Sequence, residues 1–295
     1  MTDVALPAAR FRQRPALRRR RTKNAVMTAL LLVAVALALG ALAWVLVYVG
    51  IRGFSVISPS FLTHNPPGNP AAPGGGFFNG IAGSLIVVGT ATGIAVPLGV
   101  GAAIYVVEYG RGRLRGAIRF FNDVLIGIPT IVTGAFVYAV WVTRFGFSGF
   151  AGSIALAVVM LPLVARTTEE MLRLVPTELR EGSLALGATR SQTVLRICLP
   201  TALPGIITGG MLAVARAMGE TAPLLLTVLG NDLFTQLNPL HRMETLSLQI
   251  FSNAVTGYEQ AQARGWAGAL TLIAIVLILT AVARFFGRRV QVENV

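Results

Sequence analysis

The amino-acid sequence predicts an all-α integral membrane protein with six transmembrane helices and both termini in the cytoplasm. Of its 295 residues, 54% are hydrophobic and only 13% are charged, and the mean hydropathy is +0.70. Such a composition cannot give a water-soluble globule an ordinary polar surface. Long apolar runs separated by polar segments, and basic residues gathered on alternate segments, complete the prediction.

The chain begins with an arginine-rich tail at residues 1–24, whose composition predicts that it is largely disordered. The apolar run at 25–49 is long enough to cross a hydrocarbon core of about 30 Å, and it is longer than the apolar core of a signal peptide. We therefore interpret it as an uncleaved first transmembrane helix. Residues 50–77 are rich in proline and glycine and are expected to form an external loop.

Residues 78–286 are predicted to form a core with five more transmembrane helices, followed by a cytoplasmic tail at 287–295. The second helix carries several small residues that allow close helix packing, and the third is expected to break near Pro129. The outer segment 230–264 has apolar residues at helical spacing, which predicts an interfacial or inward-dipping helix. The five helices are expected at residues 80–107, 122–142, 150–165, 201–229 and 266–286.

The distribution of basic residues predicts which loops lie inside the cell. With both termini in the cytoplasm, 20 of the 25 Lys and Arg residues fall in inner segments and four in outer ones. Arg216 is the remaining one and lies within a span. This asymmetry is what the positive-inside rule requires, and it accounts for the net charge of +13 without a nucleic-acid partner. Contact with membrane lipid is expected instead.

Residues 181–200, EGSLALGATRSQTVLRICLP, interrupt the apolar pattern on the predicted cytoplasmic side. Gly187 tolerates a positive φ, which predicts that one short helix ends there. Thr189 and Gln192 have the spacing of a capping box, which predicts the start of a second helix. We therefore expect a bent element that is suited to docking.

The second helix of this segment is expected to be half apolar. Val194, Ile197 and Cys198 share one helical face. Pro200 lacks a backbone N–H group and is expected to interrupt the helix. Cys198 is the only cysteine in the chain, so no intrachain disulfide is possible and the thiol is expected to serve packing.

The same segment resembles the EAA-x3-G-x9-I-x-L-P signature of the permease subunits of bacterial ABC importers. The matching residues are Glu181, Gly187, Ile197, Leu199 and Pro200. The resemblance implies the type I permease fold in the bacterial cell membrane, and a coupling helix that sits in a cleft of a separate ATPase subunit. The two alanines of the signature are Gly182 and Ser183 here. Both are small, although glycine weakens a helix by roughly 1 kcal/mol relative to alanine.

A second unusual stretch lies in the predicted fifth span, where Arg216 and Glu220 are four residues apart on one helical face. A charged residue at membrane depth costs about 2.5–3.5 kcal/mol on insertion scales, so the two need partners or a polar cavity. Pro223 removes a backbone hydrogen bond and Gly219 adds flexibility, which predicts a bend or hinge beside the charges.

Two interpretations of this pair remain open. The arginine and the glutamate could neutralise each other and only tie helices together. Alternatively, Arg216 could attract an anion in a substrate pathway, with Glu220 as a gate and the Thr221 hydroxyl as a further ligand. Arginine suits phosphate-like oxyanions because its planar fork donates paired hydrogen bonds and stays protonated.

Three stretches narrow the resemblance to the phosphate-specific importer permeases of the A type. The resemblance implies translocation of inorganic phosphate with a homologous permease subunit in a heterodimer, two ATPase subunits and an external phosphate-binding protein. ATP and Mg would bind to the ATPase and no cofactor to this chain. Pro129 matches a recurrent break of the third span. The stretches are FFNGIAGSL from Phe77, GIPTIVTGAFVY from Gly127 and RAMGETAPLL from Arg216.

No enzyme signature is present, so no catalytic residue is predicted. The only lysine is Lys23, in the tail, and a G-x-x-x-x-G-K-[ST] phosphate loop is absent. His64 and His241 stand far apart without further ligands, so no metal site is expected. Two other functions stay open: a permease for another oxyanion such as sulfate or molybdate, and a membrane scaffold or receptor that transports nothing.

Overall fold

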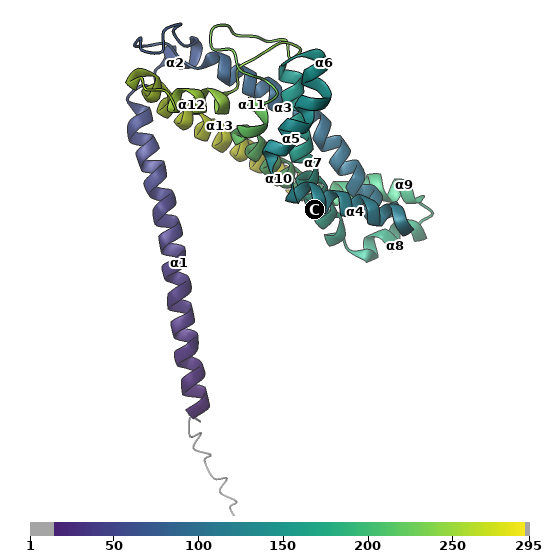
Figure 1. Cartoon of the computed structure of the whole chain (residues 1–295). Coiled ribbons are helices and arrows are strands. Elements are labelled where there is room, and N and C mark those ends of the chain that lie inside the picture. The colour runs from purple at the N-terminus through teal and green to yellow at the C-terminus, as the bar shows by residue number, and fades with distance from the viewer. Residues whose placement is uncertain (1–14, 293–295) are drawn as a thin grey trace, which may run out of the picture. The chain divides into compact units, whose positions relative to one another are not determined.

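The computed structural model describes residues 15–292, with side chains from 19 to 285, and every regular element in this range is a helix (Figure 1). This confirms the predicted all-α class. The chain divides into two compact units, Met1–Gly50 and Ile51–Val295. Because the second unit contains the 181–200 segment and the charged pair at Arg216 and Glu220, it positions both candidate sites.

The first unit contains most of α1 (Pro15–Phe54), which is longer than the predicted span at 25–49. Its most apolar stretch has no buried residue, as expected for a helix that faces lipid. Residues 15–24, predicted to be disordered, are helical, because arginine, leucine and alanine favour helix and Pro15 suits the first turn. The prediction for residues 1–14 lies outside the described residues.

Five helical stretches of the described chain are long and apolar enough to cross a membrane, and a bent pair of helices gives a sixth. Besides α1, they are α3 (Phe78–Ile104) with the π-turn η1 (Tyr105–Tyr109), α7 (Gly149–Leu174), α10 (Leu199–Gly219) preceded by α9 (Arg190–Thr193) and the π-turn η3 (Val194–Cys198), and α13 (Glu259–Val292). The multi-pass prediction is therefore confirmed. Both α7 and α13 extend well beyond their predicted limits.

The third span breaks near Pro129, as the sequence predicts, but it begins well before the predicted limits of 122–142. It consists of α4 (Gly112–Gly127) and a second rod at 105° to it, formed by α5 (Thr130–Val137), the π-turn η2 (Tyr138–Val142) and α6 (Thr143–Phe145). The break falls at Ile128, whose backbone is extended with ψ 128°. A residue that precedes proline avoids the α conformation, so Pro129 ends α4 rather than merely kinking it.

The core lies where α3, α7 and α10 pack together. Val87, Leu156 and Ala217, one from each helix, belong to one buried apolar cluster. Glycine allows close approach at Gly99, where an added Cβ would lie 2.9 Å from a methyl carbon of Val164. The predicted role of small residues on α3 is therefore confirmed at this position.

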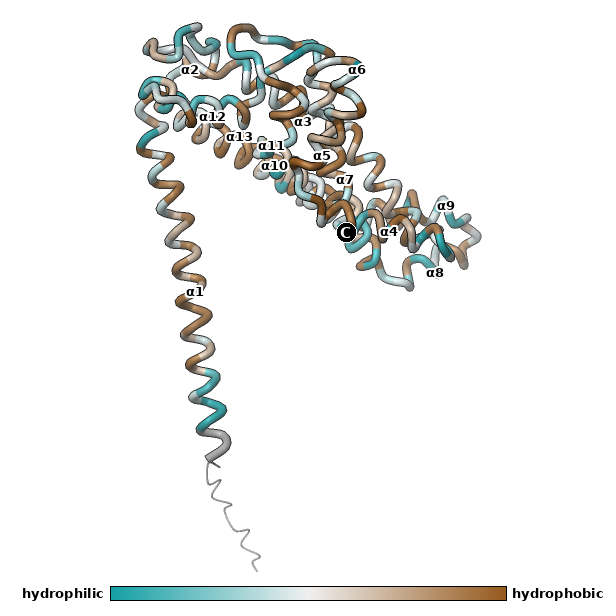
Figure 2. The backbone as a smooth tube through the Cα atoms, in the orientation of Figure 1, coloured by the Kyte–Doolittle hydropathy of each residue, from teal (hydrophilic) through white to brown (hydrophobic). Residues whose placement is uncertain are grey.

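The remaining elements gather at two opposite ends of the second unit, as Figure 1 shows. At one end, here called the basic end, lie α4, α8 (Thr177–Ala185) and α9. At the other, here called the loop end, lie α2 (Pro59–Thr63) and α12 (Leu246–Ala254), with the loops at 64–77 and 226–245. Figure 2 shows hydrophilic segments at both ends and apolar helices between them. The helix α12 confirms the one predicted in the outer segment.

Candidate functional site

The 181–200 segment folds into two short helices joined at Gly187, as the sequence predicts. Gly187 has φ 84°, and its N–H group donates to the carbonyl of Leu184. The next helix, α9, starts with a capping box in which Gln192 N–H donates to the Thr189 hydroxyl and Thr189 N–H to the Gln192 side chain. Both signals act within a single turn of chain, which is why the sequence reveals them.

Pro200 does not interrupt the second helix. The chain stays helical from Arg190 to Gly219 because the backbone widens into the π-turn η3 just before the proline. In that turn Leu199 N–H donates to Val194 O, five residues earlier. Pro200 follows this π-turn inside the continuous helix, where the shifted hydrogen-bond pattern leaves room for a residue without an N–H group. The 181–200 segment is thus joined rigidly to the fifth span.

The outer surface of this segment is exposed and partly apolar. Glu181 and Gly182 are exposed on α8, and Leu186, beside the Gly187 turn, is 91% exposed. Leu184 and Leu195 are also exposed. Apolar side chains on a polar end of a protein mark a contact surface for another molecule.

The inner surface of the segment is packed and hydrogen-bonded. Val194 and Cys198 are buried, and Ile197 and Leu199 are half-buried. The Ser183 hydroxyl lies 3.0 Å from the Thr193 hydroxyl, so serine at this signature position links α8 to α9 across the turn. An alanine could not make this link.

Ion pairs at the basic end join helices that are distant in sequence, and the sequence did not reveal them. Glu169 on α7, with 11% of its side chain exposed, accepts hydrogen bonds from Arg119 on α4 at 2.7 Å and from Arg173 at 2.6 Å. Glu108 on η1 lies 2.9 Å from Arg180 on α8. Arg173 and Glu169 are four residues apart, which is the one local signal for this network.

The charged pair of the fifth span forms an ion pair at the end of α10. Arg216 Nε lies 3.3 Å from Glu220 Oε1, and the two side chains are 60% and 15% exposed. The helix was expected to bend here, but it ends at Gly219, and Glu220 is extended with ψ 127°. Pro223 lies in the first turn of a new short helix, α11 (Ala222–Leu225), so the break is complete.

Neighbouring elements hold this break in place. The carbonyl of Thr221 accepts the N–H groups of Leu224 and Leu225, and the Ser247 hydroxyl of α12 donates to Glu220 O at 2.9 Å. An added Cβ at Gly134 of α5 would lie 2.6 Å from Pro223 Cα, so the rod that follows the Pro129 break packs directly against α11. The two predicted breaks are thus connected, although their residues are distant in sequence.

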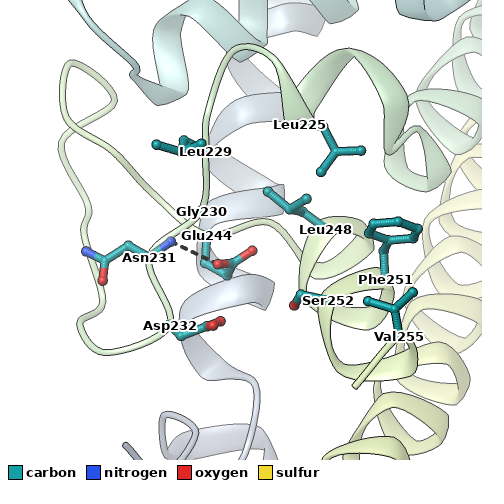
Figure 3. Close-up of a pocket in the computed structure, with 10 residues that line it drawn as sticks. All are labelled: Leu225, Leu229, Gly230, Asn231, Asp232, Glu244, Leu248, Phe251, Ser252 and Val255. Atoms are coloured by element: carbon teal, nitrogen blue, oxygen red, sulfur yellow. Dashed lines mark hydrogen bonds between the residues drawn. The ribbon is translucent and has the colours of Figure 1, made fainter. Parts of the chain in front are cut away.

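An open pocket of about 380 Å³ lies at the loop end and was not predicted (Figure 3). Figure 3 shows Asp232 and Glu244 on one side and a wall of apolar residues on the other, with Leu248 and Phe251 of α12 among them. Glu244 is 4% exposed and accepts the N–H groups of Asn231 at 2.9 Å and Thr245 at 3.1 Å. Burial raises the pKa of the Glu244 carboxyl to about 8, and the negative charge of Asp232 adds to the effect.

Among the described residues, no group of three or more His, Cys, Asp and Glu side chains is arranged to hold a metal ion. The polar groups of the pocket at the loop end are two carboxylates, an amide and a hydroxyl. The functional groups that stand out are therefore the exposed surface of the 181–200 segment, the Arg216–Glu220 pair and this acidic pocket.

The sequence and the fold match a known class of protein. Residues 95–292 match the family described as binding-protein-dependent transport system inner membrane component, and the chain belongs to this family. It resembles solved permeases in fold. A bacterial alginate ABC transporter chain has a TM-score of 0.65 at 15% identity and covers 92% of this chain, and a chain of the MetNI methionine ABC transporter has a TM-score of 0.56 at 21% identity. The first match covers 97% of the alginate transporter chain, and the second covers 72% of this chain and 93% of the MetNI chain.

More similar relatives belong to one kind of permease. The chain is 42% identical over 284 residues to phosphate transport system permease protein PstA 1 of Mycobacterium tuberculosis, with 94% of this chain and 93% of the relative covered. It is 40% identical over 271 residues to PstA of Haemophilus influenzae, with 90% and 94% covered. The chain is therefore a multi-pass protein of the inner membrane and a relative of transport permeases over nearly its whole length.

Proposed function

We propose that this chain is the membrane-spanning permease subunit of an ATP-driven importer that takes up inorganic phosphate from an external binding protein. The observation that carries the proposal is identity of about 40% to phosphate transport permeases over nine-tenths of both chains. Its sequence lacks a phosphate loop for ATP, so hydrolysis with ATP and Mg takes place on two partner ATPase subunits. A second, homologous permease completes the channel as a heterodimer.

The 181–200 segment is the site at which this chain contacts the ATPase. Its exposed face carries Glu181 and the apolar tip at Leu186, while its inner face is fixed to the bundle. Gly187, with its positive φ, sets the angle between α8 and α9 and so the shape that the ATPase recognises. The unbroken helix from Arg190 to Gly219 carries the movement toward the charged pair.

Arg216 belongs to the phosphate pathway. Its side chain is 60% exposed although it pairs with Glu220, so the guanidinium keeps donors free for an anion. Glu220 holds the arginine in place and fixes the break at Gly219, and Thr221 adds a hydroxyl beside it. Helix breaks at membrane depth are tolerated where the backbone lines a cavity, which suits the ends of α10 and α11.

Uptake by the reconstituted complex tests the transport proposal. Both permeases, the ATPase and the binding protein are placed in lipid vesicles, and ATP-dependent entry of radiolabelled phosphate is measured. Excess unlabelled phosphate should abolish the signal, whereas sulfate and molybdate should leave it unchanged. Competition by sulfate or molybdate would instead identify a permease for another oxyanion, and the absence of any ATPase that copurifies with the chain would indicate a scaffold or receptor.

Substitution of Arg216 tests the pathway residue. Arg216→Ala should lower phosphate uptake at least about 10-fold, because one charge-assisted contact contributes about 1.4 kcal/mol or more. Arg216→Lys keeps the charge but loses the planar fork, and should retain part of the uptake. ATP hydrolysis is measured in the same vesicles. Full uptake by Arg216→Ala would remove the residue from the pathway and leave the ion pair as a structural tie.

A further inference from the structure

The end of α3 is held by both helices of the 181–200 region. We propose that η1, at Glu108 and Tyr109, receives the movement of α8 and α9 and passes it to the transmembrane bundle. This inference rests on the proposed function of the chain as an ATP-driven permease. It assigns a role to Arg180 and Arg190 and to their partners, none of which is one of the matching residues of the signature.

The first contact is a clamp formed by Arg180, the residue just before Glu181. Its Nη2 donates to Glu108 Oε1 at 2.9 Å and to Leu172 O at 2.7 Å, and its Nη1 donates to Val175 O at 3.2 Å. The two carbonyls belong to the end of α7: Leu172 O also accepts the N–H group of the cap residue Val175 at 3.4 Å, and Val175 O is the carbonyl of that cap residue. One guanidinium therefore joins α8 to the ends of both α3 and α7.

The clamp is buried, so separating its two charges would be costly. The side chains of Glu108 and Arg180 are 8% and 21% exposed. A buried carboxylate that loses its cation is left with an uncompensated charge, so α8 and η1 are expected to move together rather than separate. A lysine at position 180 could supply the positive charge, but it lacks the planar guanidinium group whose two terminal nitrogens reach three acceptors.

The second contact comes from the other helix. The guanidinium carbon of Arg190, the first residue of α9, lies 5.5 Å from the centre of the Tyr109 ring, within the range of a cation–π interaction. Tyr109 follows Glu108 directly, so α8 and α9 hold adjacent residues of the same π-turn. π-Turns interrupt the regular hydrogen-bond pattern of a helix and are frequent at functional sites.

The helix that carries η1 reaches the loop end of the molecule. At its far end, the Ser84 hydroxyl accepts the N–H group of Leu246, the first residue of α12, at 2.7 Å. Asn79 donates to Asn231 O at 3.0 Å, beside the acidic pocket. A movement of η1 along α3 is therefore expected to change the pocket at the loop end, because packed helices move as rigid elements.

The test uses the reconstituted complex and measures phosphate moved per ATP hydrolysed. Glu108→Gln and Arg180→Gln are expected to lower this ratio at least about five-fold, the lower limit of a typical coupling effect. Arg180→Lys should lower it less than Arg180→Gln does. A mere loss of folded protein would lower uptake and hydrolysis together and leave the ratio unchanged.

The matched control is Arg166→Gln. Arg166 pairs with Glu170 at 2.9 Å, the same distance as the clamp, but both residues lie on α7 and are about half exposed. The Arg166→Gln variant should move as much phosphate per ATP hydrolysed as the wild type does. A ratio for Glu108→Gln equal to that of this control would overturn the proposal, as would equal ratios for Arg180→Lys and Arg180→Gln.

Arg190→Gln keeps the test decisive if the buried variants fold poorly. Arg190 and Tyr109 are both exposed, so this substitution leaves no buried charge behind. It is expected to lower the phosphate-to-ATP ratio about two-fold, in line with the modest energy of an exposed cation–π contact. An unchanged ratio would remove α9 from the proposal.

A second measurement tests the clamp independently of which substrate the protein transports. A cysteine is introduced at Ser252, which lines the pocket at the loop end, and its labelling rate with a membrane-impermeant maleimide is compared with and without ATP. Cys198 is buried and can stay in place. ATP should change the rate in the wild type and in Arg166→Gln but not in Glu108→Gln. If ATP changes labelling without any phosphate uptake, the phosphate assignment fails while the clamp stands; equal changes in all three proteins overturn the clamp.

Discussion

The two ends of the second unit both bury charged side chains, but they balance them in opposite ways. At the basic end, Glu108 and Glu169 each have an arginine partner within 3 Å. At the loop end, Glu244 is held by backbone N–H groups, and Arg264 on α13, 3% exposed, donates to the carbonyls of the loop at Pro70–Gly74. In the described part of the chain, no lysine or arginine forms an ion pair with Glu244.

This difference in how buried charges are balanced indicates a different property for each end. Arginine–carboxylate pairs between helices fix the helices to one another, which suits an end that must transmit force. A buried carboxyl group without a cation is more stable when it is protonated, which suits an end whose shape responds to its surroundings. The comparison can be tested by disturbing each end in turn.

The largest effect is expected from pH at the loop end. Glu244 has a pKa of about 8 in the folded protein, well above its ordinary value, so the folded state binds the proton more tightly than the unfolded state. Its stabilisation is complete below the ordinary pKa of about 4.5 and is lost as pH rises through about 8. Between these limits we expect the free energy of unfolding to fall by on the order of 5 kcal/mol, which is measured as a falling unfolding temperature of the purified protein.

Glu244→Gln should flatten this pH dependence, because glutamine resembles the protonated carboxyl group at every pH. Glu178→Gln is the control, since Glu178 is exposed on α8 at the opposite end. If the unfolding temperature of Glu244→Gln still falls with pH as it does in the wild type, the buried carboxyl group is not its source, and the contrast between the two ends disappears.

A smaller effect is expected from Glu169 at the basic end. Glu169→Ala leaves Arg119 and Arg173 without their shared carboxylate and should lower the free energy of unfolding by roughly 2 kcal/mol, since hydrogen bonds to charged groups contribute about 1.5–3 kcal/mol. Glu170→Ala is a matched control because its side chain is 53% exposed. Chemical denaturation in detergent gives both values, and an equal loss in the two variants would contradict a special role for the buried residue.

The smallest effect on stability is expected at Gly187. Gly187→Ala places a Cβ on a residue with φ 84°, at a cost of about 1 kcal/mol. Gly182→Ala is the contrasting change, since Gly182 lies in α8 and alanine there should add up to about 1 kcal/mol. Only the first should weaken copurification of the ATPase. Retention of the ATPase at the wild-type level by Gly187→Ala would remove the turn from the docking surface.

Much of the fold could be predicted from the sequence because the signals are local. Long apolar runs predicted the membrane helices, and the Gly187 turn and the Thr189 capping box were found where the sequence placed them. Errors arose where a local signal had more than one structural outcome. Proline ended α4 at Ile128 but was accommodated in a continuous helix at Pro200. Which outcome occurs depends on the backbone just before the proline.

At the candidate sites, the contacts between residues close in sequence could be predicted, and those between distant residues could not. The Arg216–Glu220 pair follows from helical spacing, and the structure adds the complete break at Gly219. The acidic pocket was missed because Asp232 and Glu244 lie 12 residues apart in a loop, and only the fold brings both of them beside α12. The clamp was missed because Arg180 and Glu108 are 72 residues apart.

The sequence by itself determined that this is an integral membrane protein, where most of its helices lie, that the chain turns at Gly187, and that it resembles permeases. Each of these depends on residues within a few turns of chain. Only the tertiary structure decided which charges are buried and what balances them. The packing of α3, α7 and α8 gave Glu108 an arginine, whereas the loop beside α12 gave Glu244 backbone N–H groups and a second carboxyl group, that of Asp232. The desolvation of a charge and its partner both depend on neighbours that the fold brings together.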